Sequence, residues 1–399
     1  MLRCTAVLLL CVSMLQAQEP APAPVTVFSV STTLVQVDSV VTDPQGHQVT
    51  NLKPDDFQVL VDGKPQAVTH FSYIHLDSAE VNRPSASAQL NPQDIRRSTV
   101  LVVDDLSLSF DSMARVREIL KRFIDEQMPS GDLVALWETG RRDGVFQPLT
   151  SDKRLLQAAV EKLHWNQLLD HGRFNESMIP DYTGDSEQQR EPPTNLVNER
   201  AYSRRILTLG TLGSLGQLMD ELRPVSGRKA VVLFSDGIDL LGITIPANLP
   251  NSYHDDALTR FRRVIDKANR SGAVVYAVDV RGLVAPKPGT TGGLWSSQQG
   301  LLRLAYETGG FAAVNSNALS SAVQRIEDQE KGYYLIGFKA PENISTVKPA
   351  SKAGYHSIKV SVNVHGLEVR SRSGFFGETD EVANRNIGPF NKVFGKPIF

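Results

Sequence analysis

Residues 98–113 read STVLVVDDLSLSFDSM, and this stretch decides the fold class of the chain. Its first six residues are rich in β-branched and apolar types, which is typical of a strand buried on both faces of a sheet. Two aspartates and an alternation of leucine with serine follow. Apolar residues then recur at helical spacing, at Met113, Val116, Ile119, Leu120 and Phe123. The pattern predicts a strand, a polar loop and an amphipathic helix, in that order.

The same order recurs along the chain to about residue 331. Apolar strands are predicted in LVALWET (133–139), KAVVLFS (229–235), AVVYAVD (273–279) and FAAV (311–314), with amphipathic helices between them. Strands that alternate with helices favour a largely parallel sheet covered on both faces. We therefore predict an α/β domain over residues 98–331, with a doubly wound, Rossmann-like sheet. The polar stretch 165–198 is expected to be a surface insertion, and the Gly-rich segment 285–300 a loop that exposes Trp295.

Two regions with strand-like alternation flank this domain. Residues 25–76 contain LVQVDSVVTD and DDFQVLVDGKPQAVTHF, and residues 332–378 contain YYLIGFK and YHSIKVSVNV. Period-2 alternation interrupted by Pro-Gln-Gly and Asp-Gly predicts antiparallel hairpins. Each region has few strands, so we expect the two to pack together as a small β-sandwich into which the α/β domain is inserted. Residues 77–97 are a predicted linker and 379–399 a tail.

The N-terminus predicts export. Residues 1–17 combine one cation, Arg3, with an apolar run that is too short to cross a bilayer, which is typical of a cleaved signal peptide; an uncleaved anchor is the alternative. Both cysteines, Cys4 and Cys11, lie in this segment, so the mature chain is expected to have no disulfide and no transmembrane segment. The net charge of −2 and the lack of a basic run argue against a nucleic-acid partner.

Oxygen-bearing side chains follow two of the predicted strands. Asp105, Ser107 and Ser109 come just after the first strand, and Asp236 comes directly after the strand KAVVLFS. In a parallel sheet, ligands bind at the carboxyl ends of the strands, where the strand order reverses. Carboxylate and hydroxyl oxygens suit a hard divalent cation, so the expected cofactor is Mg²⁺, Mn²⁺ or Ca²⁺. Asp104 is expected to pair with a neighbouring cation from the protein.

These residues resemble a known family. Asp-x-Ser-x-Ser after a first strand and Ser-Asp-Gly after a later one are similar to the metal-ion-dependent adhesion site of the von Willebrand factor A (VWA) domain. The flanking stretches 35–71 and 369–377 resemble VWFA-related domain proteins found widely in Acidobacteria. The resemblance implies that Asp105, Ser107 and Ser109 bind the metal, with Asp236 close behind. It also implies a threonine ligand and, as the bound group, an acidic residue of a partner protein. Thr194 is the favoured threonine, since Thr208 lies in a segment with ordinary helical spacing, and the alternative is that this chain has no threonine ligand.

Other interpretations of these residues stay open. One alternative is that Asp105 is the N-terminal cap of the following helix, with Ser107 and Ser109 satisfying backbone groups of the turn. Three functions are compatible with the pattern: an exported, non-enzymatic, metal-dependent protein-binding module in the periplasm or outside the cell, a metal-independent envelope scaffold, and a metal-assisted hydrolase. The hydrolase needs a general base, which the sequence does not offer at a convincing spacing. The sequence does not predict the oligomeric state.

Overall fold

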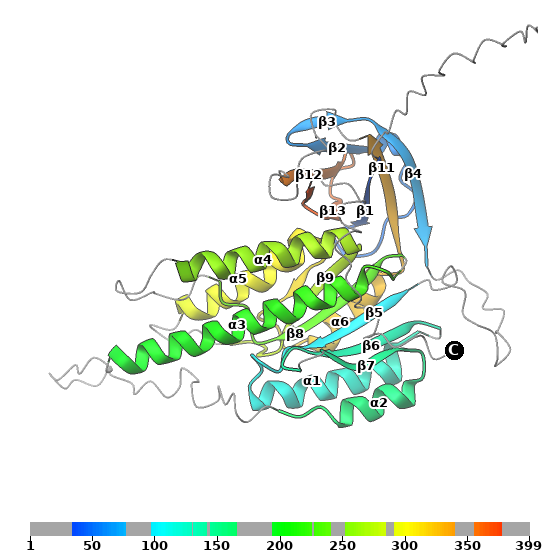
Figure 1. Ribbon diagram of the computed structural model, residues 1–399. Coiled ribbons are helices and arrows are strands. Elements are labelled where there is room, and N and C mark those ends of the chain that lie inside the picture. The colour runs from blue at the N-terminus through cyan, green and yellow to red at the C-terminus, as the bar shows by residue number, and fades with distance from the viewer. Residues whose placement is uncertain are drawn as a thin grey trace, which may run out of the picture. The chain divides into compact units, whose positions relative to one another are not determined.

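The computed structural model describes residues 34–76, 97–129, 131–141, 144–165, 194–225, 227–240, 252–284, 291–339 and 355–376 (Figure 1). The predicted signal segment 1–17, nearly all of the linker, most of the insertion and the tail lie outside these residues. Within the described part, no helix has the length and hydrophobicity needed to cross a membrane.

A six-stranded sheet forms the centre of the α/β region. Its spatial order is β10-β9-β8-β5-β6-β7, and all neighbouring pairs are parallel except β6 with β7. The strands are β5 (Ser98–Val103), β6 (Leu133–Glu138), β7 (Val145–Thr150), β8 (Lys229–Ser235), β9 (Ala273–Asp279) and β10 (Ala312–Ala313). The predicted mixed α/β fold with a mostly parallel sheet is confirmed.

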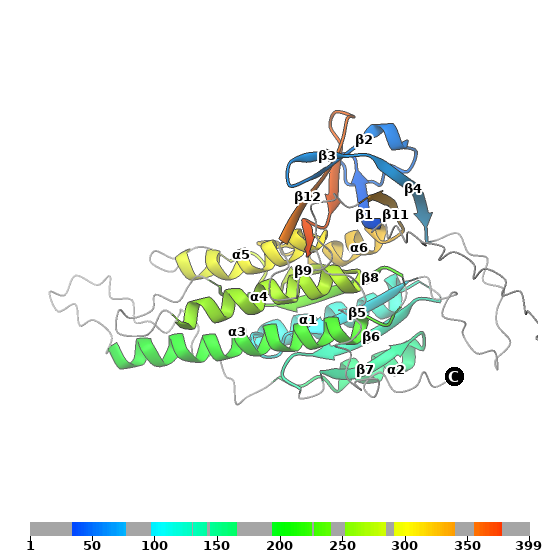
Figure 2. The same ribbon diagram turned by 45° about the horizontal axis from the view of Figure 1, so that its top comes forward.

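Helices cover both faces of this sheet because its strands are apolar on both sides. In β5, Leu101 and Val103 pack into one core and Val100 and Val102 into the other. The first core is shared with α1 (Phe110–Arg122), the π-helical turn η2 (Phe123–Gln127), α2 (Lys153–Glu161) and α6 (Leu319–Gln329). The second is shared with α3 (Thr194–Leu222), α4 (Ser252–Ser271) and α5 (Thr291–Thr308), which lie side by side in Figures 1 and 2.

The remaining strands form two four-stranded sheets, in the orders β13-β1-β11-β4 and β14-β12-β2-β3. Strands from before and after the α/β region pair with one another in both sheets: β1 pairs with β11 and β13, and β2 pairs with β12. One apolar core, which includes Val37, Phe57 and Ile336, joins the two sheets. The elements are β1 (Leu34–Thr42), η1 (Pro54–Asp56), β2 (Phe57–Val61), β3 (Lys64–Gln66), β4 (Val68–His75), β11 (Gly332–Lys339), β12 (Tyr355–Val362), β13 (Glu368–Ser371) and β14 (Gly374–Phe376).

Two loop predictions were wrong at their C-terminal ends. Helix α3 begins at Thr194, inside the predicted insertion, and α5 begins at Thr291, inside the predicted Gly-rich loop. Tertiary contacts outweigh the low helix propensity of glycine in α5. Gly300 lies so close to the Ile238 carbonyl that a Cβ atom there would approach the oxygen to 2.1 Å, so only glycine fits. Trp295 is 59% exposed, as expected, but on a helix.

Candidate functional site

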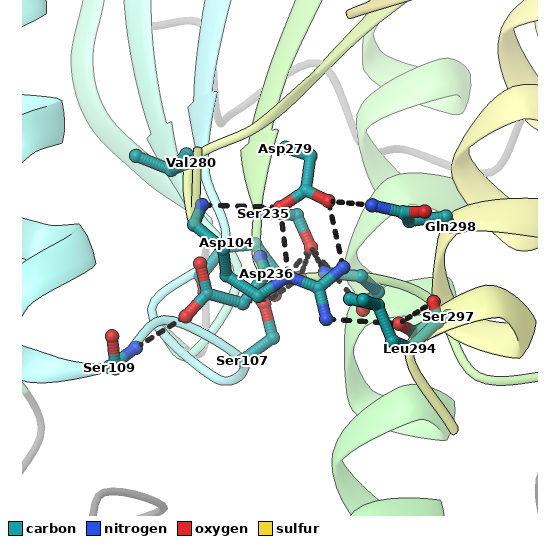
Figure 3. A network of polar contacts seen from close by, with 12 residues as sticks. Asp104, Ser107, Ser109, Ser235, Asp236, Asp279, Val280, Leu294, Ser297 and Gln298 are labelled. Atoms are coloured by element: carbon teal, nitrogen blue, oxygen red, sulfur yellow. Dashed lines mark hydrogen bonds and ion pairs between the residues drawn. The ribbon is translucent and has the colours of Figure 1, made fainter. Parts of the chain in front are cut away.

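The carboxyl ends of β5 and β8 meet at the point where the strand order reverses. The chain leaves β5 toward β6 and leaves β8 toward β9, so the two loops diverge, which is the arrangement at which ligands bind in open α/β sheets. The loop after β5 carries Asp104 to Ser109, and the loop after β8 carries Asp236. The candidate site is built from these two loops (Figure 3).

Ser107, Ser109 and Asp236 are brought together. The backbone N–H of Ser109 donates to Asp236 Oδ2 at 2.9 Å, and the backbone N–H of Asp236 donates to Ser107 Oγ at 3.3 Å. Ser109 is also the N-cap of α1, because its Oγ accepts the N–H of Ser112 at 3.2 Å. The helix-cap interpretation therefore applies to Ser109 and not to Asp105.

Asp236 has one oxygen without a partner. Its Oδ1 is enclosed and accepts no hydrogen bond from the described residues. Burial raises the pKa of Asp236 to about 6, although the Ser109 amide, the Ser112 hydroxyl and the positive charge of Arg281 lower it. A buried carboxylate oxygen with no donor is costly unless something positive binds it.

Asp104 is the most enclosed carboxylate of the site, and its role was predicted wrongly. Hydroxyl groups, not a cation, surround it. Oδ1 accepts from Thr139 and Thr211, each at 2.7 Å, and Oδ2 accepts from Ser107 and Ser235, each at 2.7 Å. Because Ser107 gives its proton to Asp104, the lone pairs of its oxygen remain for other partners. Asp104 thus orients Ser107.

Asp105 turns toward the end of β6. Its Oδ1 accepts the N–H of Gly140 at 2.7 Å and the hydroxyl of Thr139 at 3.2 Å. A Cβ atom on Gly140 would lie 2.5 Å from Asp105 Oδ2, so glycine is needed at this contact. Burial, together with the charge of Asp104, raises the pKa of Asp105. Its hydrogen bonds thus place Asp105 beside β6, whereas the two serines contact Asp236.

Glu138, the last residue of β6, is a further acid at this edge. Burial and the charge of Asp105 raise its pKa to about 7, and Arg141 opposes the rise. Glu138 was not among the site residues predicted from the sequence. Its position at a strand end, on the strand next to β5, was the available signal.

Thr194 is not brought to this cluster. It is the first residue of α3 and lies seventeen residues before Thr211, about 25 Å along the axis at a rise of about 1.5 Å per residue. Its side chain lies outside the described residues. Thr211, from the same helix, does reach the site, through its hydrogen bond to Asp104.

The chemical types of the oxygen atoms at this site are those that a hard cation prefers as ligands. Ser107, Ser109 and Asp236 offer hydroxyl and carboxylate oxygens, and the enclosed Oδ1 of Asp236 is the atom that most needs a positive partner. A cluster of three or more His, Cys, Asp or Glu side chains arranged to hold a metal is absent from the described residues. A cation here would therefore depend on serine oxygens.

Comparisons with known proteins assign no family. A scan of family models and a search of curated proteins gave no match. One solved structure, an aerotolerance-related membrane protein from Bacteroides fragilis with multiple mutations to serines, aligns at 14% sequence identity. The alignment covers 59% of this chain and 98% of that chain, with a TM-score of 0.33. A likeness this distant does not assign a function.

Proposed function

We propose that this chain is an exported, non-enzymatic protein-binding module. In this proposal the α/β region is a doubly wound domain of the VWA type, and a divalent cation at the candidate site captures an acidic residue of a partner protein. The partner class and the export follow from the sequence resemblance and from residues 1–17. The choice between periplasm and cell exterior is left open by both.

The enclosed, unpartnered Oδ1 of Asp236 carries this proposal. Ser107, Ser109 and Asp236 would hold Mg²⁺, Mn²⁺ or Ca²⁺, and Asp105 would add negative charge from the side of β6. The bound cation supplies positive charge and an open coordination position for a ligand oxygen. Asp104 keeps the Ser107 oxygen available, and the Ser109 amide fixes Asp236.

Isothermal titration calorimetry with Mg²⁺ and Mn²⁺ tests the proposal. We expect the protein to bind one divalent cation and Asp236→Asn to lose at least tenfold in affinity, because a neutral amide replaces the carboxylate. Asp105→Ala should weaken binding less. Asp239→Asn is the matched control, since Asp239 lies three residues away and accepts the Ser296 hydroxyl at 2.6 Å.

A second experiment tests whether binding of the partner protein depends on the metal. A pull-down from envelope extract should recover a protein in Mg²⁺ and lose it in EDTA or with Asp236→Asn. Equal recovery in all three conditions would favour the metal-independent scaffold. Absence of cation binding to the wild-type protein would refute the metal-dependent module.

Glu138 favours one second candidate, metal-assisted hydrolysis. Its pKa of about 7 is suited to a general base, the group that the sequence lacked, and it lies next to Asp105. Assays of ester and phosphoester hydrolysis in Mg²⁺ test this candidate. Turnover by the wild-type protein that is lost in Glu138→Gln, with cation binding intact, would support a hydrolase. No turnover supports the binding module.

A further inference from the structure

Arg281 follows β9 and is held rigidly beside the candidate site. Its Nε and Nη2 donate to the two carboxylate oxygens of Asp279, each at 2.8 Å, and its Nη1 donates to Ser297 Oγ at 3.1 Å. Asp279 is fully buried and also accepts from Gln298 at 2.9 Å. A two-pronged contact with a buried acid fixes the plane of the guanidinium group.

The guanidinium group of Arg281 has N–H groups that are not used in these contacts and could bind a ligand. An arginine side chain has five N–H groups, and these contacts use three. The described residues provide no acceptor for the other two, one on each terminal nitrogen. The Arg281 side chain is 22% exposed, whereas that of Asp279 is fully buried.

Arg281 also lies against the loop that carries Asp236. The N–H of Val280 donates to the Ser235 carbonyl at 3.2 Å, which joins the ends of β9 and β8. Gly237 touches Ser297 so closely that a Cβ atom on it would lie 2.5 Å from the Ser297 Cβ. The positive charge of Arg281 lowers the pKa of Asp236, which is the electrostatic sign of this proximity. Figure 3 shows Asp236 bonded to Ser109 on one side of this network and Asp279 bonded to Gln298 on the other.

We propose that Arg281 is a ligand-binding residue that takes one oxygen of the carboxylate recognised at the candidate site. This inference rests on the proposed function and extends it. A carboxylate has two oxygens, so one can bind the cation while the guanidinium binds the other. Arg281 thus selects a carboxylate over a hydroxyl or an amide, and Asp279 acts as its positioning residue.

Titrations with Mg²⁺ and with acetate test this role. Acetate binding is followed by ligand-observed NMR in saturating Mg²⁺, with acetamide as the uncharged control. In Arg281→Gln we expect acetate to bind roughly tenfold more weakly or worse, because charged hydrogen bonds are lost. Mg²⁺ affinity should be equal or higher, because a nearby positive charge is removed. General loss of structure would lower both affinities.

Controls separate this effect from folding. Arg115→Gln removes a nearby exposed arginine that donates to the carbonyls of Val280 and Arg281, and should change neither affinity. If Arg281→Gln does not fold, the double variant Asp279→Asn with Arg281→Gln is used in its place, because it also removes the buried charge of Asp279. The peptide acetyl-Ala-Glu-Ala-amide distinguishes an acidic side chain from a small free acid as the ligand.

The outcomes divide the two proposals. Acetate affinity in Arg281→Gln within twofold of wild type, or no acetate binding to the wild-type protein, overturns the role of Arg281. If the wild-type protein binds no Mg²⁺ but still binds acetate through Arg281, the proposed metal-dependent function fails and the role of Arg281 stands.

Discussion

Buried charges are paired differently at the two ends of the strands in the six-stranded sheet, which are called here the amino edge and the carboxyl edge. At the amino edge, arginine precedes two strands and each meets acids: Arg97 lies 2.7 Å from Asp132 and contacts Glu327, and Arg228 lies 3.1 Å from Glu330. At the carboxyl edge, acids follow the strands. Arg281 pairs with Asp279, and Arg141 lowers the pKa of Glu138. Asp104, Asp105 and Asp236 are met by hydroxyls and amides instead.

This difference separates structural from functional electrostatics. Charges that neutralise one another within the chain hold elements in place and have no need of a ligand. Acids that are solvated only by neutral donors keep their negative charge in a buried place, which is costly without a cation. The raised pKa values of Asp105, Glu138 and Asp236 reflect that cost, which the charges of Arg141 near Glu138 and of Arg281 near Asp236 offset only in part. The carboxyl edge is therefore where binding of a cation gains most.

The largest predicted effect on stability comes from removing the cation of a buried ion pair at the amino edge. Arg228→Met leaves Glu330, which is 1% exposed, without its cation, although Tyr276 still donates to it at 2.5 Å. We expect the free energy of unfolding in urea to fall by about 3–5 kcal/mol. Arg228→Met with Glu330→Met should recover most of the loss, and Arg122→Gln, in an exposed pair, should cost less than about 1 kcal/mol. A cost for Arg228→Met as small as that of Arg122→Gln would contradict the comparison.

The second prediction removes charge from the carboxyl edge. Glu138 has a pKa of about 7 in the folded protein and an ordinary value of 4.5, so the folded state binds the proton more tightly. The wild-type protein should therefore lose stability as the pH rises from 4.5 through 7, since the buried side chain becomes charged. Glu138→Gln lacks this loss and should be more stable at pH 8 by about 2 kcal/mol after screening.

Urea unfolding in EDTA at pH 5 and pH 8 measures the effect of Glu138. The difference between wild type and Glu138→Gln should be small at pH 5 and favour the variant at pH 8. The same difference at both pH values would mean that the Glu138 carboxylate is not penalised by burial.

Much of the fold could be predicted because a strand that is buried on both faces has a continuous apolar sequence. β5, β8 and β9 are continuous apolar runs, and only a parallel sheet covered by helices buries such strands on both faces. The start of α5 could not be predicted, because GTTGGLW has weak helix propensity. Its helical form depends on contacts with the loop after β8, which are distant in sequence.

The site was predictable only where its residues follow strands. Asp105, Ser107, Ser109 and Asp236 were found in this way, and their binding of a metal stays a prediction. Which of two adjacent aspartates enters the core could not be predicted, because neighbouring side chains on an extended chain point to opposite sides. Three of the hydroxyls on Asp104 come from Thr139, Thr211 and Ser235, which are far apart in sequence.

The smallest predicted effect tests whether those hydroxyls replace a cation around Asp104. Ser235→Ala removes one donor and should lower the free energy of unfolding by about 1.5 kcal/mol, since three donors remain. In an Asp104→Asn background the same substitution should cost clearly less, because the charge that Ser235 solvates is gone. Urea unfolding of the four proteins in this double-mutant cycle measures the coupling. Equal costs in both backgrounds would mean that Ser235 stabilises its own loop, through the Gly237 amide that it accepts at 3.0 Å, and not the charge on Asp104.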